Sequence, residues 1–254
     1  MQAVDVGHKV VSNKEWTEAR KAFLRKEKEF TRLRDQLSQQ RQDLPWERVE
    51  KNYVFDGPNG KESLTDLFGS KSQLIVYHFM MGPGWPEGCP SCSLVAENID
   101  GSLVHLADRD VTLLAVSRAT LPEIEAFKRR MGWRFKWVSS NGNDFNLDYH
   151  VSFTKEQVAQ GKMNYNYAET FFPREEGPGA SVFYKDESGE IFHTYSAFAR
   201  GLESLIGTYS YLDLVPKGRD EDGFAFTMAW VRHHDKYENE AVHAASCCGA
   251  EEHA

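Results

Sequence analysis

The apolar positions of the chain group into short continuous runs separated by amphipathic stretches. Residues 74–80 and 111–116 are almost entirely apolar, which is typical of strands buried on both faces of a parallel sheet. Residues 94–106 and 121–131 show helical spacing, and residues 135–138 alternate like a third strand. The pattern therefore predicts a β-α-β-α-β order over this part of the chain.

Further segments extend this order in both directions. Residues 53–55 predict a short strand that enters a turn at 56–60. After an irregular stretch near 140–179, rich in Asn, Gly and aromatic residues, residues 180–195 predict an antiparallel hairpin and 202–212 a last helix. We therefore predict an α/β three-layer sandwich, a mixed sheet with helices on both faces, that carries an insertion near 140–179.

An amphipathic stretch near the N-terminus predicts one long helix. Residues 12–15, Ser-Asn-Lys-Glu, fit a capping box, and the helix must end before Pro45. Its apolar positions are interrupted by Lys26 and recur at helical spacing at Trp16, Ala19, Phe23, Phe30, Leu33 and Leu37. We expect this helix to pack on its own domain; the alternative is a dimer-forming helix, because the spacing is heptad-like.

These patterns divide the chain into three parts. Residues 1–48 form an N-terminal helical extension, residues 49–237 the α/β domain, and residues 238–254 a tail that contains cysteine and histidine. The vicinal Cys247 and Cys248 of this tail are candidate auxiliary thiols that pass electrons to another site. Two alternatives stay open, namely a soft-metal site with a neighbouring histidine and thiols without a role.

The most informative motif is Cys89-Pro90-Ser91-Cys92, which follows a buried strand and begins a helix. Unpaired N–H groups at a helix start favour a thiolate, so Cys89 is expected to attack a disulfide. Cys92, one turn further on, would then resolve the mixed disulfide. Pro90 suits the first helical turn, and Trp85 and Pro86 are expected to shape the site above Cys89.

A metal site is the alternative for this cysteine pair. One CxxC motif supplies only half of a zinc site, and no second CxxC or nearby CxxH completes it. His233 and His234 are adjacent, and adjacent side chains point in different directions in a strand and in a helix. We therefore expect no metal at the catalytic site. No P-loop and no GxGxxG motif occurs, so no organic cofactor is expected either.

Composition restricts the partners and the compartment. The formal net charge of −8 offers nucleic acid and anionic membranes no attraction. No apolar run approaches the roughly 20 residues that span a bilayer, and the first residues lack the apolar core of a signal peptide. Four cysteines are too few for a secreted fold that disulfide bonds stabilise. We expect a cytoplasmic protein whose partners are thiols, disulfides and an external dithiol reductant, with a homodimer as an option.

Several segments resemble a bacterial family known as DUF899, whose members are described as predicted dithiol–disulfide oxidoreductases. The similar segments are residues 81–92, 116–119, 128–133 and 228–235, within a resemblance that covers roughly 16–237. The resemblance implies a thioredoxin-like fold with a redox-active cysteine pair. Thioredoxins place a cis-proline before the strand that faces the dithiol, and Pro178 is the candidate for that position here.

The segment from Val116 to Val151 also resembles peroxiredoxins. The resemblance fails at the cysteine, because Pro86 and Gly82 stand where peroxiredoxins carry a Thr or Ser and a Pro. The hydroxyl that helps to bind peroxide is therefore absent. The sequence favours a thiol–disulfide oxidoreductase; the alternatives are a peroxiredoxin-like thiol peroxidase and a metal- or metalloid-binding thiol protein.

Overall fold

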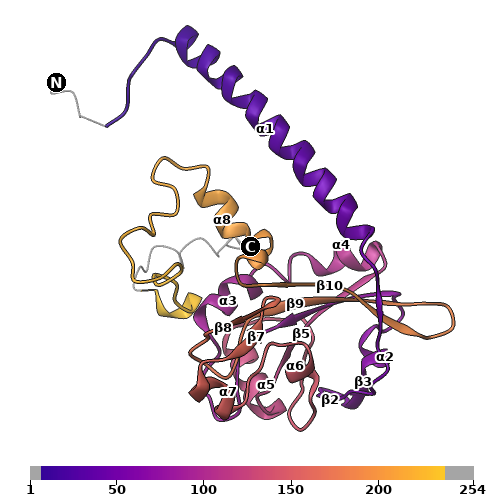
Figure 1. Ribbon diagram of the computed structural model, residues 1–254. Helices are drawn as coiled ribbons and strands as arrows, with labels where there is room; N and C mark the ends of the chain where they lie inside the picture. The colour runs from indigo at the N-terminus through magenta and orange to yellow at the C-terminus, as the bar shows by residue number, and fades with distance from the viewer. Residues whose placement is uncertain (1–6, 238–254) are drawn as a thin grey trace, which may run out of the picture. The chain divides into compact units, whose positions relative to one another are not determined.

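A computed structural model describes residues 7–237 of the chain, which divide into two compact units at Pro45. The first unit contains one helix, α1 (Asn13–Gln42), shown in indigo in Figure 1. The Ser12 hydroxyl accepts from the Glu15 N–H at 3.3 Å, and the Glu15 carboxylate accepts from the Ser12 N–H at 3.0 Å. This capping box gives hydrogen-bond acceptors to backbone N–H groups at the start of the helix. The predicted N-terminal helix is therefore confirmed.

The second unit is built on one mixed sheet. The strand order is β1-β10-β9-β4-β5-β6-β2-β3. The strands are β1 (Glu47–Arg48), β2 (Val54–Gly57), β3 (Gly60–Ser63), β4 (Gln73–His78), β5 (Val111–Ser117), β6 (Trp137–Ser139), β9 (Gly179–Lys185) and β10 (Ile191–Phe198). Strand β4 pairs parallel with β5 and antiparallel with β9. A β-α-β unit beside an antiparallel hairpin is the thioredoxin-like arrangement, as predicted (Figure 1).

Helices cover both faces of this sheet. The helices that precede the insertion are α2 (Leu64–Leu67), α3 (Pro90–Ala96), α4 (Leu103–Asp108) and α5 (Leu121–Arg130). Those that follow β10 are the 3₁₀-helix η1 (Ala199–Leu205), α8 (Gly207–Leu212) and the 3₁₀-helix η2 (His234–Lys236). One core cluster joins the sheet to α3, α5 and α8, and a second joins it to α2 and α6. The predicted three-layer architecture is therefore confirmed.

The insertion has a small core of its own. It contains α6 (Phe145–Asp148), α7 (Lys155–Gln160) and a hairpin of β7 (Met163–Tyr165) and β8 (Ala168–Thr170). Val151, Phe153, Met163 and Tyr165 pack together with Phe198 of β10. Three aromatic residues of the irregular stretch, Phe153, Tyr165 and Phe172, pack in this third cluster, whereas Phe145 and Tyr149 pack in the second. No helix among residues 7–237 is both long enough and apolar enough to cross a membrane.

Two predicted helices are interrupted, and the two breaks lie close to each other. The helix predicted over 94–106 ends at Ala96 and resumes at Leu103, and the last helix divides at Ile206. The Asn98 side chain donates to the Leu94 carbonyl at 2.9 Å. A Cβ at Gly207 would lie 2.7 Å from Asn98 Oδ1, so the two turns approach closely.

Two strand predictions also need correction. Strand β3 falls in residues that we interpreted as a connection, because four residues carry too weak an alternation to reveal a strand. The strand predicted over 135–138 begins instead at Trp137, and all three residues of β6 are buried. Trp137 faces the first core cluster and Val138 the second, so no polar alternation is possible in β6.

Gly88 tests how tightly the sheet packs against the turn that follows β4. A Cβ at this position would lie 2.4 Å from Phe79 Cε1 and 2.8 Å from Phe127 Cε1. We expect Gly88→Ala to lower the free energy of unfolding by roughly 1–3 kcal/mol through overpacking, as measured by chemical denaturation. Gly101→Ala is the control, because nothing lies within 4 Å of its added methyl group. Equal stability of the two variants would contradict this packing.

Candidate active site

The first cysteine lies at the junction between β4 and α3. Cys89 is the N-cap of α3, with an extended backbone (φ −62°, ψ 129°), and Pro90 occupies the first helical turn. The Cys89 N–H donates to the Met80 carbonyl at 3.1 Å. The Cys89 carbonyl accepts from the N–H and the hydroxyl of Ser93, both at 3.0 Å. These bonds fix the backbone on both sides of the Cys89 sulfur.

The two thiols differ in exposure and in acidity. Cys89 is partly exposed, Cys92 is buried, and both are free thiols. A hydrogen bond from the Cys92 thiol is the largest influence on Cys89 and lowers its pKa to about 6, with help from backbone N–H groups. The charge of Arg174 acts in the same direction, and burial opposes it. Burial raises the pKa of Cys92. The pair therefore holds one thiolate and one protonated thiol at neutral pH.

Both thiols border a cavity of about 390 Å³. Its wall combines β4 and α3 with Phe172 of the insertion, with residues 199–209 and with residues 227–228. Most of these side chains are apolar. The charges of Arg200 and Glu203 neutralise each other, because Arg200 Nε donates to Glu203 Oε1 at 2.7 Å. The cavity suits an apolar group beside a disulfide. The sequence predicted a helix over 202–212 and a family-like segment at 228–235, but it did not place either beside the thiols, because no motif marks that contact.

The residues predicted to shape the site divide into two groups. Pro178 lines the cavity, and Pro90 lies between the two cysteines in the chain. The peptide bond before Pro178 is trans, like every other bond of residues 7–237. Trp85 packs against the core cluster that contains Cys92, in a turn outside the cavity wall, and Pro86 in the same turn is exposed.

A distant histidine holds the residue that precedes the nucleophile. His233 is 1% exposed, and its Nε2 lies 2.9 Å from the Gly88 carbonyl. Because a carbonyl only accepts, Nε2 carries the proton and donates. The Nδ1 atom then accepts from Arg130 at 3.3 Å. The segment near the end of the described chain thus fastens the turn that carries Cys89.

Ion pairs surround this histidine. The Glu87 carboxylate binds Lys236 and Arg130, each at 2.7 Å, and these two cations lower its pKa. Arg130 also binds Asp235 at 2.8 and 2.9 Å. Glu87 lies two residues before Cys89, but its charge is compensated by two cations. These contacts join η2 to α5 and to the turn before α3.

The remaining candidate ligands do not converge. His234 turns to Glu97, with Nδ1 2.6 Å from the carboxylate, while its neighbour His233 faces Gly88. Within residues 7–237, no three His, Cys, Asp or Glu side chains are arranged to hold a metal ion. Cys247 and Cys248 lie outside the described residues, and their role stays a prediction.

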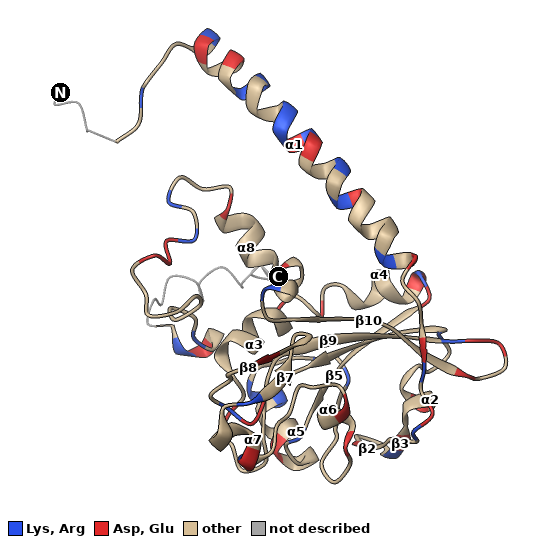
Figure 2. Cartoon of the chain, viewed as in Figure 1, with Lys and Arg blue, Asp and Glu red and all other residues tan. Residues whose placement is uncertain are grey.

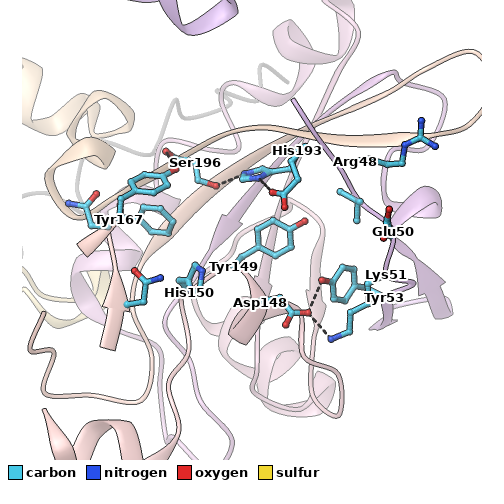
Figure 3. Close-up of a pocket in the computed structure, with 15 residues that line it drawn as sticks. Arg48, Glu50, Lys51, Tyr53, Asp148, Tyr149, His150, Tyr167, His193 and Ser196 are labelled. Atoms are coloured by element: carbon cyan, nitrogen blue, oxygen red, sulfur yellow. Dashed lines mark hydrogen bonds and ion pairs between the residues drawn. The ribbon is translucent and has the colours of Figure 1, made fainter. Parts of the chain in front are cut away.

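A larger cavity, of about 850 Å³, lies among β1, β10 and the insertion (Figure 3). In its wall His193 Nε2 is 2.7 Å from the Ser196 hydroxyl, which suggests a nucleophile and its base. The same Nε2 lies 3.1 Å from the Tyr195 carbonyl and must donate to it. His193 therefore has no free lone pair toward Ser196. Among residues 7–237, no cysteine borders this cavity, so the dithiol is the better candidate for redox chemistry.

The acidity of Cys89 gives a direct test of the site. We expect iodoacetamide to alkylate Cys89 with a pH midpoint near 6, because only the thiolate reacts. Cys92→Ala removes the largest stabilising hydrogen bond and should move the midpoint up toward the ordinary value of a cysteine. Ser91→Ala, which keeps its backbone N–H, should leave it unchanged. Mass spectrometry of the Cys89 peptide gives the rates, and equal midpoints in all three proteins would refute the assignment.

Comparisons with known proteins found similar solved structures and one protein family. Curated proteins give no match. Xanthomonas campestris peroxiredoxin Q has 13% identity and a TM-score of 0.44, over 65% of this chain and 96% of that one. Mycobacterium tuberculosis peroxidoxin BcpB has 9% identity and a TM-score of 0.43, over 65% and 95%. Residues 6–237 match the model of a family described as bacterial protein of unknown function, and the chain therefore belongs to the DUF899 family.

Proposed function

We propose that this protein is a thiol–disulfide oxidoreductase in which Cys89 attacks and Cys92 resolves. The observation that carries the proposal is the asymmetry of the pair. The partly exposed Cys89 borders a cavity and has a lowered pKa, whereas the buried Cys92 has a raised pKa and donates to the Cys89 sulfur. Thiol–disulfide exchange needs a thiolate that a substrate can reach and a second thiol within bonding range.

The reaction proceeds in two exchanges. The Cys89 thiolate attacks one substrate sulfur, the substrate disulfide breaks, and the other substrate sulfur leaves as a thiolate that takes up a proton. Cys92 then loses its proton and attacks the Cys89 sulfur, which releases the second substrate thiol. The substrate disulfide is reduced by two electrons, and Cys89 and Cys92 are oxidised to a disulfide. An external dithiol returns the pair to the reduced state by the reverse exchange.

Nearby groups support the second exchange. The Tyr77 hydroxyl lies 3.5 Å from the Cys92 carbonyl, and a hydrogen bond from Tyr77 acts to lower the pKa of Cys92 against the effect of burial. The Met80 backbone acts in the same direction. Both groups favour the Cys92 thiolate at the moment when it must attack. The apolar wall of the cavity favours substrates with an uncharged group next to the disulfide.

Serine variants of the two cysteines test the proposed roles. Cys89→Ser should reduce the turnover of a chromogenic aromatic disulfide to the uncatalysed rate, because no nucleophile remains. Cys92→Ser should keep the first exchange and accumulate a mixed disulfide on Cys89, visible by mass spectrometry as an adduct of one substrate half. Wild-type turnover in the Cys92→Ser variant, without an adduct, would refute the resolving role. Rapid formation of a Cys89 sulfenic acid with hydrogen peroxide would indicate a peroxidase instead.

The second cysteine pair is proposed as the route by which electrons return. An external dithiol would reduce a Cys247–Cys248 disulfide, and the resulting dithiol would then reduce the Cys89–Cys92 disulfide by exchange. The described contacts that support this route anchor Lys236 to Glu87 at 2.7 Å, two residues before Cys89. Cys247 lies eleven positions after Lys236, and an extended chain of eleven residues spans at most about 36–40 Å.

Replacing both tail cysteines tests this route. The Cys247→Ser, Cys248→Ser double variant should reduce a first equivalent of disulfide at the wild-type rate, because the Cys89–Cys92 pair is intact. Steady-state turnover with a protein dithiol reductant should fall, because regeneration loses its relay. Stopped-flow and steady-state assays separate the two phases. Ser246→Ala is the matched control, and unchanged steady-state turnover in the double variant would remove Cys247 and Cys248 from the mechanism.

A further inference from the structure

The apolar stripe of α1 repeats with a seven-residue period. Successive members are three and four residues apart, at Trp16, Ala19, Phe23, Lys26, Phe30, Leu33 and Leu37. In heptad notation, Trp16, Phe23, Phe30 and Leu37 occupy position a, and Ala19, Lys26 and Leu33 occupy position d. A seam confined to a and d is narrower than the apolar face of a helix that packs on a globular core. It is the pattern of a coiled coil.

The side chains of this seam are exposed within the first unit, Met1–Pro45. None of the residues of α1 is buried, and Trp16, Phe23 and Phe30 are 56%, 57% and 66% exposed. A helix of this length extends about 45 Å, so the seam is a long apolar surface rather than an isolated side chain. Extended exposed apolar surfaces mark interaction sites.

We propose that this seam pairs with the same seam of a second copy of the chain, in a parallel two-stranded coiled coil. In a parallel pair each seam residue faces its own copy, so the seam forms successive layers. Large and smaller layers alternate, because small Ala19 follows the large Trp16, and the flexible Lys26 separates Phe23 from Phe30. The Lys26 stem lies along the seam while its ammonium group reaches water.

The charges beside the seam select the parallel orientation. Figure 2 shows acidic and basic residues along the length of α1. The charged residues are Glu15 and Glu29 at position g, and Arg20, Glu27, Arg34 and Arg41 at position e. In a parallel pair, each g residue faces the e residue five positions further along the partner helix. Glu29 therefore meets Arg34 of the partner subunit, and two-fold symmetry repeats every pair. In an antiparallel pair position g faces position g, so Glu15 and Glu29 would meet no arginine.

These charges are available for such pairs. Within the described chain, neither Glu29 nor Arg34 makes an ion pair. Glu15 uses only its Oε2 atom to bind the N–H and the hydroxyl of Ser12, which leaves Oε1 for a partner. Arg20 pairs with Glu27 of its own helix at 2.8 Å and is exposed, so it can exchange partners at little cost.

A second copy fits α1 better than a lipid surface does. The helix carries more basic than acidic side chains, which would attract anionic headgroups. However, helices that lie on membranes bury a wide apolar face, and Lys26 interrupts this seam near its centre. Glu15 and Glu29 also border the seam directly and would have to lie against anionic lipid. The acidic side chains have favourable partners only in the parallel pair.

Neighbouring residues provide a matched pair of variants for the test. Phe23 lies in the seam, and Leu24 lies beside it at position b, outside the seam. For the full chain at physiological salt, sedimentation equilibrium should give a dimer for the wild type and for Leu24→Glu, but a monomer for Phe23→Glu. Circular dichroism and the alkylation of Cys89 confirm that the variants fold. A monomeric wild type, or a dimer that survives Phe23→Glu, would overturn the proposal.

A charge exchange tests the orientation. Glu29→Arg places like charges across the parallel interface twice and should weaken the dimer about tenfold, as should Arg34→Glu. The double variant should restore the wild-type affinity. In an antiparallel pair Glu29→Arg would strengthen association instead, and that result would overturn the parallel arrangement. Flotation of a monomeric wild type with phosphatidylserine vesicles, lost in Phe23→Glu, would assign the seam to a membrane.

Discussion

The chemistry proposed for this protein depends on one hydrogen bond, from the thiol of Cys92 to the sulfur of Cys89. It exists because Cys89 caps α3 and Cys92 follows within the first turn of that helix. Burial keeps the proton on Cys92, and a protonated thiol can donate. Exposure of Cys89 leaves its sulfur open to a substrate. The same turn of helix therefore separates the two cysteines into a nucleophile and a resolving thiol.

Distant parts of the chain keep this turn in place. The bond from His233 to the Gly88 carbonyl joins residues 145 positions apart, and the aromatic rings of Phe79 and Phe127 leave no room for a side chain at Gly88. The segments that follow β10 also complete the wall of the cavity beside the thiols. The end of the described chain thus contributes both to the position of the nucleophile and to the surface that a substrate meets.

The features that sequence predicts well are those that local pattern determines. Continuous apolar runs reveal β4 and β5 because both faces of these strands are covered, and the CxxC spacing places two thiols on one helical turn whatever surrounds them. The breaks in the helices lie instead where Asn98 approaches Gly207, and the role of His233 depends on a carbonyl far along the chain. Contacts of this kind have no local signature, so periodicity cannot reveal them.

The source of the low pKa of Cys89 also bears on how the reaction advances. Arg174 contributes through a charge on an exposed side chain, which salt screens, whereas the hydrogen bonds from Cys92 and the backbone act at contact distance and are screened far less. The thiolate is therefore stabilised chiefly by the group that later displaces the product. When Cys92 gives up its proton to attack, it withdraws its donor from the Cys89 sulfur, and the two sulfurs become bonded instead. The hydrogen bond that stabilises the Cys89 thiolate is therefore lost only in the second exchange, when Cys89 no longer acts as the nucleophile.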